Sequence, residues 1–350
     1  MKKSTTFLST LAIAFAMLLT SCGGEKTGSI AGAGATFPLP FYNVAFKAYQ
    51  ETTGNQVTYG GVGSGGGIRS LKDRIVDFAG SDAYLSEKEM EAMPAEVIHI
   101  PSCLGAVVIA YNLPGVDKLV LDGEIVADIY LNKITKWNDA RIVALNPGVN
   151  LPDMTITPVF RSDGSGTTFV FTDYMTKVSS QWANDLGRAK ALKWPVGIAS
   201  KGNPGVAGTV KETVGSVGYI GSEYGFALKI PSAALKNRAG KVVVPSLESI
   251  SASATSEMPA DMRAMITNSP AAEAYPISCW TWLLVYADQS YDNRTEDQAR
   301  FTIDLMKWMM TEEAQSLTTK VHYAPLPASV VKSNLTTLNN IKFNGKKLYK

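Results

Sequence analysis

The sequence has few residues of the kinds that most often carry catalysis or bind metals. Its 350 residues include two histidines, His99 and His322, and three cysteines. His99 lies between isoleucines in an apolar run, as expected of a packed strand residue, and His322 falls in a turn-like stretch. Neither belongs to a His, Asp and Glu cluster with zinc-ligand spacing. We therefore expect no metal and no cofactor.

Two sequence patterns of hydrolases are also missing. A nucleophile elbow needs glycine two residues before and two residues after the serine, and neither Ser64 nor Ser165 has both. The glycine-rich loops lack the Lys-Ser/Thr pair of a P-loop. A phosphatase is therefore a weaker interpretation than a binding protein, and we predict that the chain is not an enzyme.

Net charge is close to zero, which argues against one large class of partner. The 33 basic and 31 acidic residues give +2. Residues 1–21 hold two lysines and no acidic residue, so the remaining chain has a net charge of 0. A nucleic-acid surface needs a basic excess, and we expect none here. Any anion site must be local, built from a few well-placed groups.

The first 21 residues resemble a lipoprotein signal peptide. Lys2 and Lys3 precede a mostly apolar run, residues 7–19, that is too short to cross a bilayer comfortably. The run ends in Leu19-Thr20-Ser21-Cys22, which resembles a bacterial lipobox. The alternative is an ordinary signal peptide with a coincidental cysteine. The resemblance implies cleavage before Cys22, lipid attachment to its sulfur, and a membrane-anchored protein in the periplasm or at the cell surface.

Residues 22–28 are small and polar, and we interpret them as a flexible tether. No later stretch approaches the roughly 20 apolar residues of a spanning helix. With Cys22 lipidated, Cys103 and Cys279 are left, and such a compartment would permit a disulfide between them. Their sequence positions do not say whether they lie close enough. We favour two buried free thiols over a bridge.

The rest of the chain alternates apolar strand-like runs with helical patterns, which predicts an α/β fold of two domains. One example is the run of apolar residues at helical spacing across residues 41–49, which follows a small-residue strand at 30–35. Two apolar runs of strand length, 107–111 and 282–286, lie far apart in sequence. We expect them to connect the two domains.

Three loops place small residues at predicted helix starts: Gly34-Ala35-Thr36-Phe37, Gly63-Ser64-Gly65-Gly66 and Gly164-Ser165-Gly166-Thr167. The first turn of a helix has backbone N–H groups without partners, and its dipole favours negative charge. Helix starts of this kind bind oxyanions, and Ser and Thr add hydroxyl donors. A single loop of this kind is usually only a turn that connects a strand to a helix. Three in one chain predict an anion site.

Two charged residues refine this prediction. Arg161 precedes the third loop, and its planar fork can hold two oxygens of a tetrahedral anion, although a surface ion pair with Asp163 is the alternative. Asp82 follows a strand-like run, and its carboxylate can only accept hydrogen bonds when it is ionised. Phosphate keeps a proton near neutral pH and can donate it, whereas sulfate cannot. A carboxylate in the site would therefore select phosphate by penalising sulfate; an ordinary turn cap is the alternative.

These motifs resemble the periplasmic phosphate-binding protein of the bacterial high-affinity phosphate ABC transporter, from about Ile30 to the C-terminus. Besides the three loops, the matching segments are 76–82, 128–139, 161–167, 215–219 and 323–327, in the family's order. The resemblance implies a two-lobed periplasmic-binding-protein fold (type II), with mixed sheets flanked by helices and a two-strand hinge. It implies lobe I from 28–108 plus 282–350, and lobe II from 109–281.

The same resemblance implies the site and the partners. Phosphate would be held by Thr36, Phe37, Ser64, Asp82, Arg161, Ser165, Gly166 and Thr167, with Asp163 pairing with Arg161 at the cleft edge. Gly65 stands beside Ser64 where many relatives carry a second serine, so it keeps a backbone N–H there but supplies no hydroxyl. The partners would be inorganic phosphate and the permease and ATPase subunits of an ABC transporter, with the chain itself a monomer. Binding of another oxyanion, such as sulfate or molybdate, and a surface adhesion or sensory role are the remaining alternatives.

Overall fold

The computed structural model describes residues 27–255 and 257–349. The predicted signal peptide, Cys22 and most of the tether lie outside these residues. Within them, no helix is both long enough and apolar enough to span a membrane. The helices are α1 (Leu39–Thr53), α2 (Ser64–Lys72), α3 (Glu87–Glu91), α4 (Gly123–Tyr130), α5 (Ala140–Leu145), α6 (Gly166–Val178), α7 (Ser180–Asp185), α8 (Gly202–Glu212), α9 (Ser222–Leu228), α10 (Leu247–Ser251), α11 (Glu296–Trp308), α12 (Glu312–Lys320) and α13 (Ala328–Asn339).

Eight strands form one continuous mixed sheet in the order β2-β1-β3-β11-β4-β8-β6-β7. They are β1 (Ser29–Gly34), β2 (Gln56–Gly61), β3 (Phe78–Ser81), β4 (Val97–Tyr111), β6 (Thr157–Arg161), β7 (Ile198–Ser200), β8 (Ser216–Gly221) and β11 (Ser278–Tyr286). Smaller sheets contain β5 (Val120–Leu121), β9 (Ala234–Lys236) and β10 (Val242–Val243), and β12 (Lys342–Phe343) with β13 (Lys346–Lys347).

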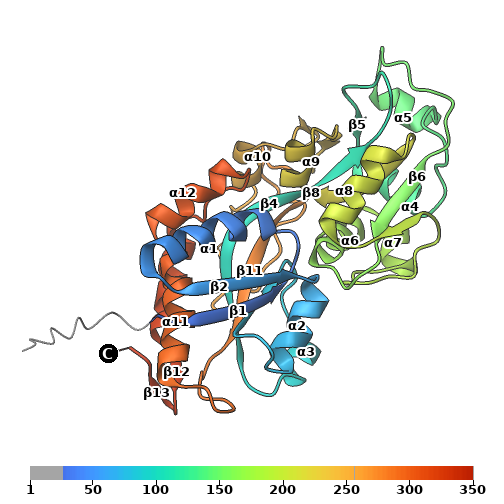
Figure 1. Ribbon diagram of the computed structural model, residues 1–350. Coiled ribbons are helices and arrows are strands. Elements are labelled where there is room, and N and C mark those ends of the chain that lie inside the picture. Colours follow the sequence, from blue (N-terminus) through green and yellow to red (C-terminus); the bar gives the residue numbers. More distant parts are fainter. Residues whose placement is uncertain (1–26, 256, 350) are drawn as a thin grey trace, which may run out of the picture.

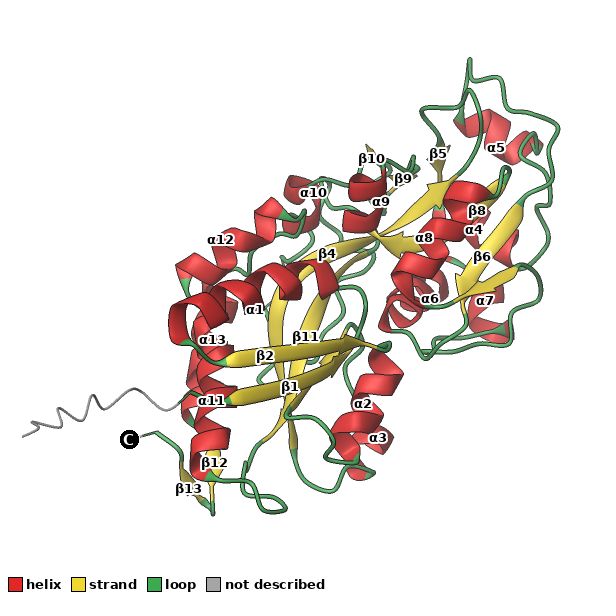
Figure 2. Ribbon diagram, in the orientation of Figure 1, coloured by secondary structure: helices red, strands yellow, loops and turns green. Residues whose placement is uncertain are grey.

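The long strand β4 joins two halves of this sheet (Figures 1 and 2). Its residues 97–106 pair with β11, and its residues 107–111 pair with β8. We call β2, β1, β3, β11 and the start of β4 the first half, and the end of β4 with β8, β6 and β7 the second half. Helices cover both halves, so the fold is the predicted mixed α/β type.

The position of β11 differs from the expectation for residues 282–286. This strand pairs with β3 on one side and with residues 97–106 of β4 on the other, so it lies inside the first half. It does not run on into the second half as β4 does. An interior strand and a connecting strand are both buried on both faces and give the same apolar run. The sequence pattern therefore could not distinguish them.

The C-terminal helices return to the first half, as Figure 2 shows for α11, α12 and α13 beside α1 and β1. Helix α11 starts with a capping box, in which Thr295 and Gln298 each bond the other's backbone N–H. Its apolar face, including Ile303 and Leu305, is buried in the same core as Phe41 and Tyr49 of α1. The two ends of the chain therefore share one hydrophobic core.

The two cysteines of the described residues are buried free thiols. They lie on neighbouring strands, but Cys103 pairs with Thr281 and Cys279 with Gly105. The two cysteines are therefore not opposite each other in the ladder, and the favoured expectation of two buried free thiols is confirmed. His99 is likewise a packed residue of β4, and its Nε2 accepts a hydrogen bond from the Leu85 N–H at 3.0 Å.

Candidate functional site

The predicted site residues lie where the strands of the two halves end. Thr36 and Phe37 follow β1, Asp82 follows β3, and Arg161 is the last residue of β6. Strands β1 and β3 are parallel, so the ends that carry Thr36 and Asp82 lie at the same sheet edge. Loops at the carboxyl ends of parallel strands are the usual place for a ligand in α/β folds.

Each of the three predicted loops does stand at a helix start. Thr36 and Phe37 come just before α1, whose N-cap is Pro38. Ser165 is the N-cap of α6 and accepts a hydrogen bond from the Thr168 N–H at 3.0 Å. Ser64 is the first residue of α2 and not its N-cap. The cap is Gly63, whose φ of 82° is left-handed and favours glycine.

The first and second halves meet at the Ser64 hydroxyl. Its oxygen accepts hydrogen bonds from the Gly166 N–H at 3.0 Å and from the Asp82 N–H at 3.3 Å. A hydroxyl has two acceptor positions and one hydrogen. With both acceptor positions occupied, the Ser64 hydrogen has to be donated to a further group.

The glycines at this junction permit the close approach. A Cβ added at Gly166 would lie 2.4 Å from Ser64 Oγ and 2.7 Å from Asp82 Oδ2. The Gly65 N–H donates to the Gly164 carbonyl at 2.9 Å, a backbone bond between the two halves. Gly65 therefore contributes a backbone contact and no side-chain hydroxyl.

Arg161 is buried and held by Asp163 in a two-point ion pair. Its Nε lies 2.8 Å from Asp163 Oδ1 and its Nη2 lies 2.6 Å from Oδ2. The remaining Nη1 donates to Thr167 Oγ1 at 3.3 Å. Burial alone would raise the pKa of Asp163, but its bonds to Arg161 outweigh that effect and lower it. The alternative of an exposed ion pair is wrong, since the Arg161 side chain is 1% exposed.

Asp82 is a buried carboxyl with partners from both halves. Thr281 of β11 donates to its Oδ1 at 2.5 Å, and Thr167 of α6 donates to its Oδ2 at 3.4 Å. Burial raises the pKa of Asp82 to about 7, against the lowering effects of the Thr281 bond, the Arg161 charge and the Thr167 bond. The carboxyl can therefore exchange a proton near neutral pH, which an ordinary turn cap would not do.

Phe37 is fully buried, and tyrosines from separate parts of the fold hold it and the neighbouring Thr36. Its carbonyl accepts a hydrogen bond from the Tyr323 hydroxyl, and its ring packs edge-on against the same tyrosine at 5.9 Å. Tyr224 of α9 donates to the neighbouring Thr36 carbonyl at 2.6 Å. These two phenols fix the loop that precedes α1.

Comparison with known proteins identifies the family of this chain. The family model of the PBP superfamily domain matches residues 21–313. The phosphate-binding protein PstS of Xylella fastidiosa (strain Temecula1) is 40% identical over 314 residues, which cover 88% of this chain and 84% of that protein. The phosphate-binding protein PstS of Methanocaldococcus jannaschii is 35% identical over 332 residues, covering 88% and 85%. The chain belongs to the PstS phosphate-binding protein family.

Solved structures show the same fold. A high-affinity periplasmic phosphate-binding protein (PfluDING) bound with phosphate has a TM-score of 0.68 at 20% identity, covering 90% of this chain and 99% of that one. A phosphate ABC transporter substrate-binding protein from Clostridium perfringens, with bound phosphate, has a TM-score of 0.63 at 17% identity, covering 85% and 100%. At these identities the likeness concerns the fold alone.

Two residues of the candidate site in this PstS-family chain were not predicted from its sequence. Thr281 holds the Asp82 carboxylate from β11, and no local pattern marks it because it lies 199 residues away. Asn203 lies at the start of α8 and bonds both Thr36 and Thr167. A signal for Asn203 does exist. Strand β7, the single residue Lys201, and helix α8 beginning at Gly202 repeat the strand-to-helix layout of the three predicted loops.

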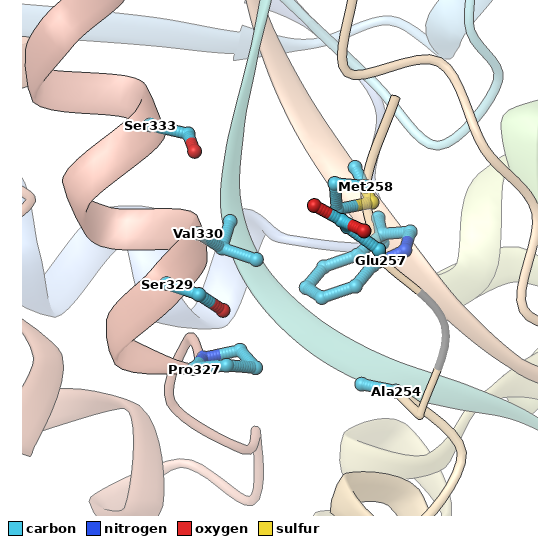
Figure 3. Close-up of a pocket in the computed structure, with 8 residues that line it drawn as sticks. Ala254, Glu257, Met258, Pro327, Ser329, Val330 and Ser333 are labelled. Atoms are coloured by element: carbon cyan, nitrogen blue, oxygen red, sulfur yellow. The ribbon is translucent and has the colours of Figure 1, made fainter. Parts of the chain in front are cut away.

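A separate pocket of about 120 Å³ lies between α13 and the residues Ala254, Glu257 and Met258 (Figure 3). Figure 3 shows Ser329 and Ser333 of α13 opposite Glu257 and Met258. The described residues that line it include one acidic side chain and no lysine or arginine. This lining is unsuited to an anion, and it shares no residue with the predicted site.

Proposed function

We propose that the chain captures inorganic phosphate between the two halves of the structure and delivers it to a membrane ABC transporter for import. The observation that carries this proposal is the state of three buried hydroxyls, those of Thr36, Ser64 and Thr167. Each accepts two hydrogen bonds from N–H groups. Each hydroxyl therefore keeps its one hydrogen for donation, as an anion requires. The Thr167 hydrogen is donated to Asp82 Oδ2 at 3.4 Å in this structure, and it would turn from this long bond to an anion.

The charged groups of the site support the same ligand. Arg161 supplies a guanidinium that is held in place by its ion pair with Asp163, and the Asp163 carboxylate partly offsets its positive charge. The proposed donors are the side chains and backbone N–H groups of Thr36, Phe37, Ser64, Arg161, Ser165, Gly166 and Thr167. Asp82 is the proposed acceptor for the proton of phosphate. A fully deprotonated anion such as sulfate would face that carboxylate without a proton to donate.

Capture and release would use the connection between the halves. The resemblance gives lobe I as 28–108 plus 282–350 and lobe II as 109–281. Because β11 pairs within the first half from Ser278 onward, we propose that residues 278–281 belong to lobe I and that lobe II ends at residue 277. Phosphate would first contact one lobe, and the other would then close on it. The closed form would dock on the permease and ATPase subunits. The chain would act as a monomer in the periplasm or at the cell surface, anchored through lipidated Cys22.

Calorimetry with phosphate and sulfate tests the ligand. The protein is unfolded in guanidinium, dialysed free of phosphate and refolded before titration. We expect one phosphate per chain, with sulfate bound at least about a hundredfold more weakly, since an unpaired buried charge costs several kcal/mol. Asp82→Asn should narrow this ratio, and the exposed Asp153→Asn should leave it unchanged. Equal affinity of the wild type for the two anions would refute the proposal.

The anchor is tested separately by labelling cells with a radioactive fatty acid. Label should appear on the wild-type chain and be lost from Cys22→Ser, which should be secreted without an anchor. Label retained by Cys22→Ser would show that the lipobox interpretation is wrong.

A further inference from the structure

Asn203 is a fully buried residue whose side chain connects the two halves of the sheet. It is the second residue of α8, a helix that packs on β8, β6 and β7 of the second half. Its Oδ1 accepts from the Gly221 N–H at 3.0 Å. Its Nδ2 donates to Thr36 Oγ1 at 3.2 Å and to Thr167 Oγ1 at 3.0 Å. Both amide hydrogens and the amide oxygen are thus engaged, and this fixes the orientation of the side chain.

Asn203 alone occupies both acceptor positions of the Thr36 hydroxyl oxygen. Its oxygen accepts both the Asn203 backbone N–H, at 3.0 Å, and the side-chain Nδ2. The Thr36 hydrogen must therefore be donated away from Asn203. Because Thr36 belongs to the first half and Asn203 to the second, this arrangement exists when the halves are together.

Asn203 and Arg161 together occupy both acceptor positions of the Thr167 hydroxyl oxygen. Its oxygen accepts from Asn203 Nδ2 at 3.0 Å and from Arg161 Nη1 at 3.3 Å. In this structure its single hydrogen is donated to Asp82 Oδ2 at 3.4 Å, a long bond from which it would turn to reach an anion. One amide group thus orients two of the hydroxyls in the proposed phosphate site.

We propose that Asn203 is a positioning residue for anion binding, which occupies the acceptor sites of the Thr36 and Thr167 hydroxyls so that both donate to a bound oxyanion. This inference rests on the proposed function. Asn203 makes all its side-chain contacts with protein groups and acts through the two threonines. It forms its bonds to Thr36 as the halves close, so it slows release more than it speeds capture.

Aspartate at this position provides a sharp test, because it has the size of asparagine and the opposite hydrogen-bonding role. The Gly221 contact survives in Asn203→Asp, but the second carboxylate oxygen replaces the donor that faces both threonines. Both hydroxyls would then donate to the new carboxylate in place of the anion, beside an added negative charge. Asn203→Ala removes the donor without this competition.

Phosphate affinity is measured by calorimetry on protein expressed from the full chain with Cys22→Ser. We expect Asn203→Ala to weaken binding about tenfold and Asn203→Asp about a hundredfold or more, with most of the change in the release rate by stopped-flow. Asn237 is a matched control, a buried asparagine with four hydrogen bonds outside the site. Asn237→Ala and Asn237→Asp should each change the phosphate Kd by less than about twofold.

A role in packing alone predicts the reverse order, since aspartate preserves shape and alanine does not. Asn203→Asp binding phosphate as tightly as Asn203→Ala, or more tightly, would therefore overturn the inference. Absence of phosphate binding by the wild type would instead overturn the proposed function.

Thermal unfolding and circular dichroism establish that each variant is folded. Should Asn203→Asp not fold, a cycle with Thr36→Val decides the question. The tenfold effect of Asn203→Ala should fall below about threefold in the Thr36→Val background. If Asn203→Ala still weakened phosphate binding about tenfold in the Thr36→Val background, the inference would be overturned.

Discussion

Replacing Asp82 by asparagine should change how the stability of the ligand-free protein depends on pH. Burial raises the pKa of this carboxyl from an ordinary value of 3.8 to about 7 in the folded protein. Between these two values the folded state binds a proton that the unfolded state has lost. Stability therefore falls as pH rises through this window, by about 1.4 kcal/mol per pH unit for this one group.

The interval from 3.8 to about 7 corresponds to roughly 4 kcal/mol in total, and the part between pH 5 and pH 8 to about 3 kcal/mol. Asp82→Asn has no proton to lose over this range. The free energy of unfolding of the variant minus that of the wild type should therefore be about 3 kcal/mol larger at pH 8 than at pH 5. The comparison across pH cancels any fixed cost of the new amide, which faces a Thr167 hydroxyl already bonded to Arg161 and Asn203.

Urea unfolding measures this difference, followed by fluorescence of the six tryptophans and by circular dichroism. Coincident transitions by the two probes establish two-state behaviour. Phosphate must be absent from the protein and the buffers, since bound ligand would stabilise the folded state by mass action. Asp153→Asn, an exposed ion-pair partner of Lys136, serves as the control and should show no comparable trend.

A difference between Asp82→Asn and wild type that stays constant from pH 5 to pH 8 would refute the reasoning. It would mean that the carboxyl remains hydrated or fully paired in the free protein. The junction between the halves would then be open to water when phosphate is absent.

Three further predictions concern binding and are measured by calorimetry. Arg161→Lys should weaken phosphate binding about 10- to 100-fold, because a lysine cannot bond Asp163 at two points and also reach Thr167; an unchanged Kd would remove Arg161 from the site. Gly166→Ala should weaken it at least about tenfold, because the new Cβ would lie 2.4 Å from Ser64 Oγ, whereas Gly208→Ala in α8 meets nothing within 4 Å and should have no effect. Sulfate affinity should rise about tenfold from pH 8 to pH 6, as Asp82 takes up a proton near pH 7 and becomes a donor, and this rise should vanish in Asp82→Asn.

Much of the candidate site could be predicted from local sequence because its groups are set by the ends of elements. Glycine, serine and threonine at a helix start expose backbone donors whatever the rest of the fold does. This is why Ser165 could be placed at the N-terminus of α6, and Asp82 directly after β3, from the sequence alone. The likeness of whole segments to the phosphate-binding family extended these local predictions to one site.

The tertiary structure alone decided how the groups of the site use their hydrogen bonds. Thr281 reaches Asp82 from 199 residues away, and Asn203 reaches Thr36 from 167 residues away. Such pairs depend on strand order and on the packing of α8, which leave no periodic trace in the chain. The placement of β11 inside the first half was likewise decided by the tertiary structure. Every strand that is buried on both faces gives a near-continuous apolar run, so this pattern does not show where the strand lies in the sheet. The local sequence therefore determines which polar group stands at each strand or helix end. The packing of distant segments determines which hydrogen-bond partner that group has.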